Sequence, residues 1–192
     1  MCELVVTEHV TLDGVMQAPG RADEDTGGGF TLGGWAMPNN DQVMGQKLSE
    51  GMAQAGTLLL GRRTYEDFYG FWPKQKDNPF TDVLNRVAKY VASRTLTEPL
   101  PWENSKLLNG DVPDAVAALK AQADQDIGVL GSGELVQTLI RHKLVDRYLL
   151  LIHPLVLGSG RRLFPDGLFA SLRLVDAVTT TKGVVIATYQ PA

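Results

Sequence analysis

A recurring unit organises the middle of the chain: a short apolar segment, a turn of small or polar residues, and an amphipathic segment with helical period. The apolar segments have the length and composition of buried strands. Together with a first strand near the amino terminus, the pattern predicts strands over residues 4–9, 57–60, 87–92, 106–108 and 127–130. It predicts helices over residues 41–53, 62–72 and 112–121, and a further helix with an apolar stripe at Leu135, Val136, Leu139 and Ile140.

The carboxyl-terminal part of the chain follows another pattern. Residues 147–152 form one more apolar run, and residues 171–180 and 184–190 flank Lys182-Gly183 like the two arms of a hairpin. Strands that alternate with helices form parallel sheets with helices on their faces, whereas hairpins are antiparallel. The pattern therefore predicts an α/β three-layer sandwich, with a mostly parallel central sheet and antiparallel carboxyl-terminal strands. Because no linker or repeat divides residues 1–192, we expect a single domain.

A glycine-rich stretch over residues 20–34 interrupts this pattern. It contains Gly27-Gly28-Gly29 and Gly33-Gly34, and it is too long for an ordinary connection. Such loops inside compact domains are usually functional lids or disordered segments. Phe30 and Trp35 give this one apolar groups to pack, so we interpret it as a substrate lid. Trp35 could stack on a flat heterocycle or anchor the lid.

Composition narrows the possible functions. The chain has 192 residues, of which 44% are hydrophobic and 21% charged, as is ordinary for a soluble globular protein. Its 18 basic and 22 acidic side chains give a formal charge of −4, so we expect no nucleic-acid partner. The apolar run over residues 148–157 is too short to span a bilayer, and the amino terminus lacks a secretory signal. With a single cysteine, these features predict a cytoplasmic protein without membrane contacts.

A metal centre is not expected. Cys2 is the only cysteine, and His9, His142 and His153 show no spacing typical of metal ligands. His142 is explained as a cation near the carboxyl end of a helix. The chain also lacks a P-loop and the H-x-E and P-C-x-x-C motifs. Their absence argues against kinase chemistry and excludes zinc-dependent deamination.

Three predicted strands end in small or basic residues, at the edge of the sheet where α/β proteins bind ligands. The first of these turns consists of Gly61, Arg62, Arg63 and Thr64. A glycine lets the backbone approach a ligand closely, and a helix start offers free amides. Thr64 and Asp67 also match a helix-capping pair, which explains Thr64 equally well. Two arginines at a helix start oppose the helix dipole, and a bound anion would resolve that conflict.

The other two strand ends repeat this chemistry. They carry Gly131, Ser132, Gly133 and Glu134 in one turn, and Ser93 and Arg94 in the other. A lone G-x-G is weak evidence, and Ser132 could simply cap a helix. Because the three turns follow their strands at equivalent positions, their arginines and hydroxyls could converge on phosphates. The planar guanidinium suits a ribose 2′-phosphate, which predicts NADPH rather than NADH as the cofactor.

An ordered set of motifs covers essentially the whole chain: LDG, LLLGRRTYE, YVASRTL, IGVLGSGELVQTLI and VDRYLLLIHPLVLGSGRRLF. Together they resemble the dihydrofolate reductase-like superfamily, and most closely the reductase domain of bacterial bifunctional riboflavin-biosynthesis deaminase-reductases and its stand-alone relatives. The resemblance implies that residues 61–64 bind the phosphates of NADPH, and that Ser93 and Arg94 flank its adenosine end. It also places residues 131–134 along the pyrophosphate and nicotinamide, and Asp13-Gly14 in the loop over the active site.

Two acidic residues are candidates for a catalytic proton donor. True dihydrofolate reductases carry an acidic residue at the start of the helix after the lid, and Asp41 has roughly that place behind a longer lid. A plain helix N-cap explains Asp41 equally well. Asp13 is the second candidate. The basic loop Gly158-Ser159-Gly160-Arg161-Arg162 is interpreted as a solvated turn, with a site for a substrate phosphate as the alternative.

The sequence thus predicts a reductase that transfers hydride from NADPH to a C=N or C=O carbon of a small planar heterocycle. The substrate would be a pyrimidine-ribityl compound, as in riboflavin synthesis, or a pterin. A nucleotide-binding protein without turnover is the alternative. The edge of the carboxyl-terminal strands and the apolar residues 148–157 also predict a homodimer, as does the resemblance.

Overall fold

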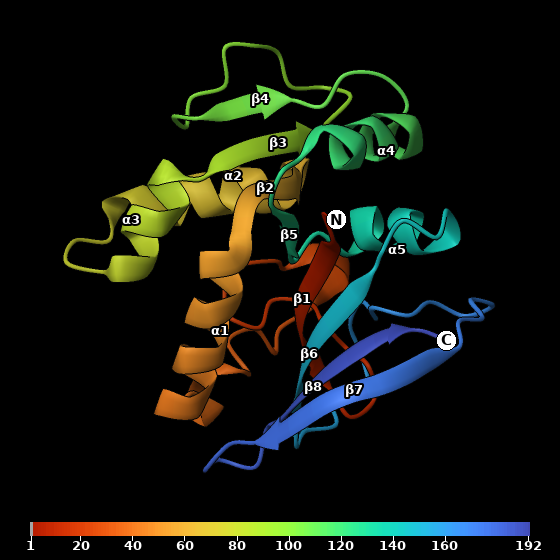
Figure 1. The fold of residues 1–192 in the computed structure, drawn as a ribbon. Helices are drawn as coiled ribbons and strands as arrows, with labels where there is room; N and C mark the ends of the chain where they lie inside the picture. Colours follow the sequence, from red (N-terminus) through yellow and green to blue (C-terminus); the bar gives the residue numbers. More distant parts are fainter. Residues whose placement is uncertain (1) are drawn as a thin grey trace.

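The computed structural model describes residues 2–192, which form one eight-stranded sheet with helices on both faces (Figure 1). The strands are β1 (Leu4–Thr11), β2 (Ala55–Gly61), β3 (Ala88–Ala92), β4 (Ser105–Leu107), β5 (Asp126–Leu130), β6 (Arg147–His153), β7 (Leu172–Thr179) and β8 (Val185–Pro191). The α-helices are α1 (Gln42–Gln54), α2 (Arg62–Phe71), α3 (Pro79–Arg86), α4 (Val112–Gln122) and α5 (Gly133–Arg141).

The order of the strands confirms the predicted topology. The sheet runs β4-β3-β2-β5-β1-β6-β8-β7, and its first six strands are parallel. Strand β8 pairs with β6 in the antiparallel direction, and β7 pairs with β8 likewise. The turn between β7 and β8 is closed by a hydrogen bond from the N–H of Thr180 to the carbonyl of Val184, with Gly183 at φ +79°. The last two strands therefore form a hairpin appended to a parallel sheet.

Two apolar cores occupy opposite faces of the sheet, as a three-layer sandwich requires. Successive side chains of a strand point to opposite faces, so Leu58 and Leu60 of β2 lie on one side and Leu59 on the other. Leu58 and Leu60 pack in the core that includes Tyr65 of α2, together with residues of α1 and α3. Leu59 packs in the core that includes Val136 of α5, together with residues of α4. Figure 1 shows the same division, with α1 to α3 on one side and α4 and α5 on the other.

Helix α3 is absent from the sequence-based prediction. Asn78 caps it by accepting a hydrogen bond from the N–H of Phe80, and Pro79 occupies its first turn. Only Thr81 and Leu84 of this short helix are buried, so its apolar stripe is too brief to show as a period. Within residues 2–192, every helix is too short or too polar to cross a membrane.

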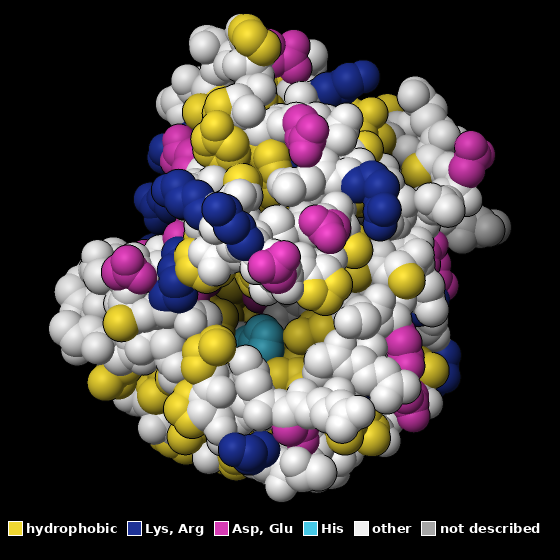
Figure 2. Space-filling model, turned by 90° about the vertical axis from the view of Figure 1, so that its left-hand side faces the viewer, with side chains coloured by type: hydrophobic (Ala, Val, Ile, Leu, Met, Phe, Trp, Pro, Cys, Tyr) yellow, Lys and Arg dark blue, Asp and Glu magenta, His cyan; other side chains and the backbone are white. Residues whose placement is uncertain are grey.

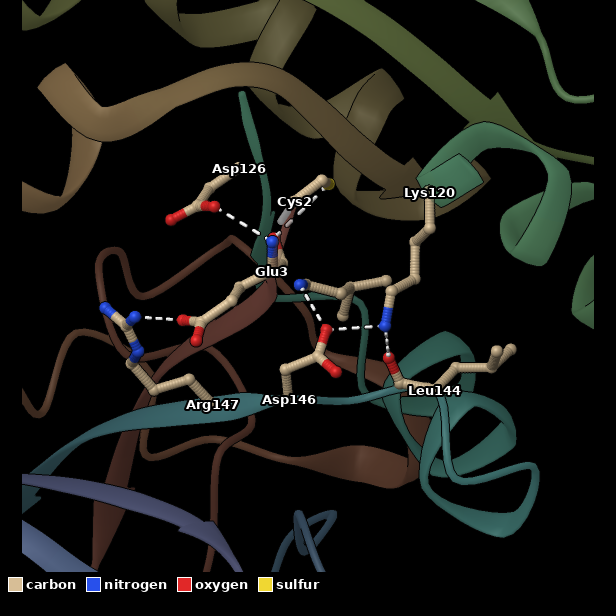
Figure 3. Close-up of polar contacts among 8 residues, drawn as sticks. Cys2, Glu3, Lys120, Asp126, Leu144, Asp146 and Arg147 are labelled. Carbon is tan, nitrogen blue, oxygen red and sulfur yellow. Dashed lines mark hydrogen bonds and ion pairs between the residues drawn. The ribbon is translucent and has the colours of Figure 1, made fainter. Parts of the chain in front are cut away.

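Charged side chains join the amino-terminal ends of β1, β5 and β6 to α4 (Figure 3). Asp126 accepts a hydrogen bond from the N–H of Glu3 at 2.9 Å, and the side chain of Glu3 pairs with Arg147. Asp146, just before β6, pairs with Lys120 of α4. These bonds fix how the central strands start. The opposite edge, at the carboxyl ends of the parallel strands, carries the turns that the sequence predicts to bind a ligand.

Candidate functional site

The three turns predicted to bind a ligand lie side by side at the carboxyl edge of the sheet. Strands β3, β2 and β5 are neighbours, and they lead into Ser93, Gly61 and Gly131. A hydrogen bond joins two of the turns, because the N–H of Gly61 donates to Oγ of Ser132 at 2.9 Å. A Cβ atom on Gly131 would lie 3.3 Å from the side chain of Thr64, so the starts of α2 and α5 are in contact. Two of the three turns are therefore in direct contact, and the convergence of their side chains on phosphates stays a prediction.

Helices α2 and α5 both begin without a side-chain cap. Gly61 is the N-cap residue of α2, so Thr64 lies inside the helix and the alternative explanation, a Thr64–Asp67 capping pair, is wrong. Asp67 instead pairs with Arg21 of the lid. Ser132 occupies the N-cap position of α5, as expected, but its backbone is left-handed (φ +68°) and its hydroxyl serves Gly61. The free amides and positive dipole ends of both helices are suited to phosphate groups.

The arginines around these helix starts can reach an anion. Arg62 pairs with Glu66 at 3.0 Å and Arg63 pairs with Glu134 at 3.6 Å, all through largely exposed side chains. Exposed ion pairs contribute little free energy, so a phosphate can compete for either guanidinium. Arg94 is exposed, and it forms no ion pair with any residue from 2 to 192. The charge that a nucleotide phosphate needs is therefore present in this region.

Ser93 and Gly133 have local structural roles. The hydroxyl of Ser93 accepts hydrogen bonds from the N–H groups of Thr95 and Leu96, so it shapes the turn that carries Arg94. Gly133 lies under the segment that enters the lid, where a Cβ atom would come within 2.6 Å of Sδ of Met16. A side chain at residue 133 would therefore require the side chain of Met16 to move.

Ion pairs hold the amino-terminal part of the lid. Arg21 pairs with Asp67 and lies 4.4 Å over the ring of Phe71, which ties the start of the lid to α2. Asp25 pairs with Arg161 of the second basic loop. This loop was expected to be a solvated turn or a phosphate site. The loop is largely exposed, as a solvated turn would be, and its Arg161 also holds the lid through the pair with Asp25.

The aromatic residues of the lid are buried. Phe30 and Trp35 are 6% and 7% exposed, and they share a small apolar cluster with Val15. The indole N–H of Trp35 donates to the carbonyl of Gln17 at 2.7 Å, which is the anchoring role considered for Trp35. Its stacking on a ligand stays a prediction.

Both candidate proton donors are committed to hydrogen bonds. Asp41 caps α1 through the N–H of Met44 and also accepts bonds from the N–H and hydroxyl of Thr181. These bonds lower the pKa of Asp41. Asp13 accepts from the hydroxyl of Thr11 and from the N–H groups of Leu157 and Gly158, and these bonds lower its pKa to about 2. The catalytic assignments stay predictions, and the geometry gives them no support.

A cavity of about 170 Å³ lies between α1 and the sheet. Val5 and Thr7 of β1 line it, and His9 follows on the same face of this strand. Nδ1 of His9 lies 2.9 Å from Nε2 of His153, the last residue of β6. Figure 2 shows the side of the molecule on which a histidine ring is recessed in a hollow among apolar side chains. The two histidines are far apart in the sequence, and their contact was not predicted.

Burial controls the charge of this histidine pair and of the glutamate beside it. Burial, with a contribution from His153, lowers the pKa of His9 to about 3, and burial lowers the pKa of His153 to about 4. Both rings are therefore neutral near pH 7. Glu8 points to the other face of β1, where burial raises its pKa well above the usual value, and its Oε1 has no partner within residues 2–192. The contact between His9 and His153 depends on the pairing of β1 with β6, and the sequence alone does not show which strands pair.

Comparison with known proteins places this geometry in a family. The model of the RibD C-terminal domain matches residues 3–186. The chain is 32% identical over 194 residues to the uncharacterized protein YyaP of Bacillus subtilis (strain 168), an alignment that covers 97% of this chain and 93% of that protein.

Two solved structures show the fold. A putative riboflavin biosynthesis protein from Shewanella sp. PV-4 superposes with a TM-score of 0.72 at 23% identity, covering 100% of this chain and 99% of that chain. Dihydrofolate reductase from Enterococcus faecalis, complexed with NADP(H), superposes with a TM-score of 0.63 at 14% identity, covering 98% and 96% of the two chains. The fold is thus dihydrofolate reductase-like, as the motifs implied. Since the family model spans nearly the whole chain, the protein belongs to the RibD C-terminal domain family.

Proposed function

We propose that this protein is an NADPH-dependent reductase of a small planar heterocycle. Its family and its dihydrofolate reductase-like fold support a reductase. The observation that carries the choice of cofactor is the pair of uncapped helix starts joined by the Gly61–Ser132 hydrogen bond, with Arg62, Arg63 and Arg94 around them. Amides at helix starts and guanidinium groups are the donors that bind nucleotide phosphates.

Different residues of the site would bind different parts of NADPH. The first-turn amides of α2 and α5 would hold the pyrophosphate, with Gly61 and Gly131 allowing close approach of the backbone. Arg94 would hold the 2′-phosphate, since it is exposed and free of any ion pair within residues 2–192. When bound, the cofactor supplies a hydride to the substrate carbon, and the protein supplies orientation and exclusion of water.

The same proposal covers the substrate and the setting of the protein. A pyrimidine-ribityl compound is supported by the family and by the riboflavin-biosynthesis protein that shares this fold. A pterin is the second candidate, supported by the likeness to dihydrofolate reductase. We further propose that the enzyme works in the cytoplasm as a homodimer.

A binding titration and a substrate screen test the proposal together. Quenching of tryptophan fluorescence should show tighter binding of NADPH than of NADH, and NADPH oxidation should follow when an aminouracil, a pterin or a small carbonyl compound is added. Binding without oxidation of any of these compounds would favour a nucleotide-binding protein without turnover. Equal affinities for NADPH and NADH would show that the arginines do not bind the 2′-phosphate.

A further inference from the structure

We propose that His9 is a catalytic residue that donates a hydrogen bond from Nε2 to the substrate, and that His153 and Asn39 are positioning residues for it. The substrate atom it would hold is a lone-pair acceptor at the reducible bond, either a carbonyl oxygen or an unprotonated ring nitrogen. This inference rests on the proposed function, and it narrows the chemistry of the substrate.

The direction of the hydrogen bonds follows from the chemistry of the three side chains. Nδ2 of Asn39 lies 3.4 Å from Nδ1 of His153. An amide nitrogen only donates, so Nδ1 of His153 accepts and carries no proton. The proton of this neutral ring must then be on Nε2, which donates to Nδ1 of His9 across 2.9 Å. Because Nδ1 of His9 accepts, the proton of His9 is on Nε2.

Packing holds the rings in this arrangement. His153 has no exposed surface, and the ring of Trp35 meets it edge-on with 5.2 Å between the ring centroids. Asn39 belongs to the short turn just before α1, so the chain of donors starts where the lid ends. His9 and Asn39 are each partly exposed, and His153 between them is fully buried. The free Nε2–H group is therefore the accessible end of a chain of fixed donors.

The position of His9 fits contact with a substrate. It stands near the carboxyl end of the central strand β1, the edge where ligands of such sheets bind. Its face of the strand continues from Val5 and Thr7, which line the cavity beside α1. His9 itself lies further along β1, towards the edge of the sheet where the turns before α2 and α5 lie.

The electrostatics of the pair suit a neutral donor. A ring with a strongly lowered pKa stays neutral at physiological pH, so it polarises an acceptor without adding a charge to an apolar site. A donor fixed in advance stabilises the negative charge that develops on the acceptor as hydride arrives at the adjacent carbon. The acceptor then takes its proton from water, and His9 keeps its own. A substrate that is already cationic at this atom would gain nothing from His9.

Nitrogen NMR of the histidine rings in the unmodified protein gives the first test, since it distinguishes protonated from bare ring nitrogens without any turnover. We expect a proton on Nε2 and none on Nδ1 of both His9 and His153. Adding an acceptor probe, such as an aminouracil or a pterin, together with NADPH should shift the Nε2–H signal of His9. A bare Nε2 on His9 would overturn the proposal.

Kinetics of matched variants give the second test. His9→Leu should lower kcat by about 100-fold, the usual effect of losing one such donor, while the Kd for NADPH stays within about twofold. His9→Gln keeps an N–H donor at the position of Nε2 and should recover most of the rate. For the positioning role, His153→Gln should likewise keep the proton on Nε2 of His9, and His153→Leu should lose it. His142→Leu is the control, because His142 lies exposed at the end of α5.

The outcomes separate the inference from the proposed function. If the unmodified protein binds and oxidises NADPH but His9→Leu leaves kcat unchanged, only the role of His9 is overturned. If the unmodified protein binds no NADPH, or oxidises it with none of the probes, the proposed function fails and takes the role of His9 with it. The NMR readout and the Kd for NADPH also show whether each variant is folded.

Discussion

The hydroxyl of Ser132 accepts a hydrogen bond from the backbone N–H of Gly61, which lies 71 residues earlier in the chain. This bond aligns the starts of α2 and α5, so we expect Ser132→Ala to lower stability by about 1 kcal/mol and to weaken NADPH binding several-fold. Ser132→Gly should lose less stability, because glycine relaxes the left-handed backbone at this residue. Urea unfolding and fluorescence titration measure the two effects. An equal loss of affinity in Ser159→Ala, on an exposed loop, would contradict the prediction.

Arg94 should decide between the two nicotinamide cofactors. Arg94→Ala should weaken binding of NADPH by on the order of 2 kcal/mol and leave NADH unchanged, because only NADPH carries the 2′-phosphate. Arg141→Ala provides a matched control, since Arg141 is also exposed and free of ion pairs within the described chain. If Arg94→Ala weakens the binding of NADPH and NADH equally, Arg94 does not bind the 2′-phosphate.

The lid should open on removal of its anchor. Arg161→Ala breaks the ion pair with Asp25, so backbone amides over residues 27–34 should exchange faster with solvent in the free protein. In the unmodified protein, the same amides should exchange more slowly when NADPH and a substrate analogue are both present. Hydrogen-exchange mass spectrometry follows both changes. Arg162→Ala should have no effect, since that side chain is exposed and its backbone bridge to Val15 is kept.

Asp13 should make stability sensitive to acid. The folded pKa is lowered to about 2, below the roughly 3.9 of an unfolded aspartate, so its stabilisation is complete above about pH 4. That stabilisation is lost as the pH falls from about 4 towards 2. Asp13→Asn should be less stable near neutral pH and should show a smaller decline over this interval. Thermal unfolding at successive pH values measures it, with Asp124→Asn, which changes an exposed aspartate, as the control. An unchanged acid profile in Asp13→Asn would exclude the linkage.

Strand β7 should form the dimer contact. It lies at the edge of the sheet with Leu174 and Val175 about half exposed, and an uncovered apolar edge favours pairing. Light scattering should give twice the chain mass of 20.9 kDa, and Leu174→Asp should give the monomer. Leu12→Asp, a change at an exposed leucine elsewhere, should remain dimeric. A mass near 20.9 kDa for the unmodified protein would refute the prediction.

The sequence was most informative where the signal is local. Strand ends such as Gly61 and Gly131 could be placed because each apolar run stops at a small residue, and topology then brought them together. Helix α3 was missed because just two of its residues are buried. The alternative that Thr64 caps α2 was wrong, because Gly61 is the N-cap residue and Thr64 lies inside the helix.

The relationships that the sequence did not show are the long-range ones. His9 and His153 are 144 residues apart, and only the pairing of β1 with β6 brings them together. The ion pair of Asp25 with Arg161 likewise depends on how two loops lie against each other. Loops show no hydrophobic period from which this contact could be predicted. Residue type alone made each of these groups look like an isolated surface or core residue.

One short segment carries both His153 and the anchor of the lid. His153 ends β6, and Arg161 lies in the loop that follows, with Gly158 held to Asp13 on the way. An insertion or deletion between them would shift the lid relative to the histidine pair. We therefore expect relatives that share the function to vary in length at the β7–β8 turn but to keep this loop at constant length, so that loop length itself becomes a criterion for sorting the family.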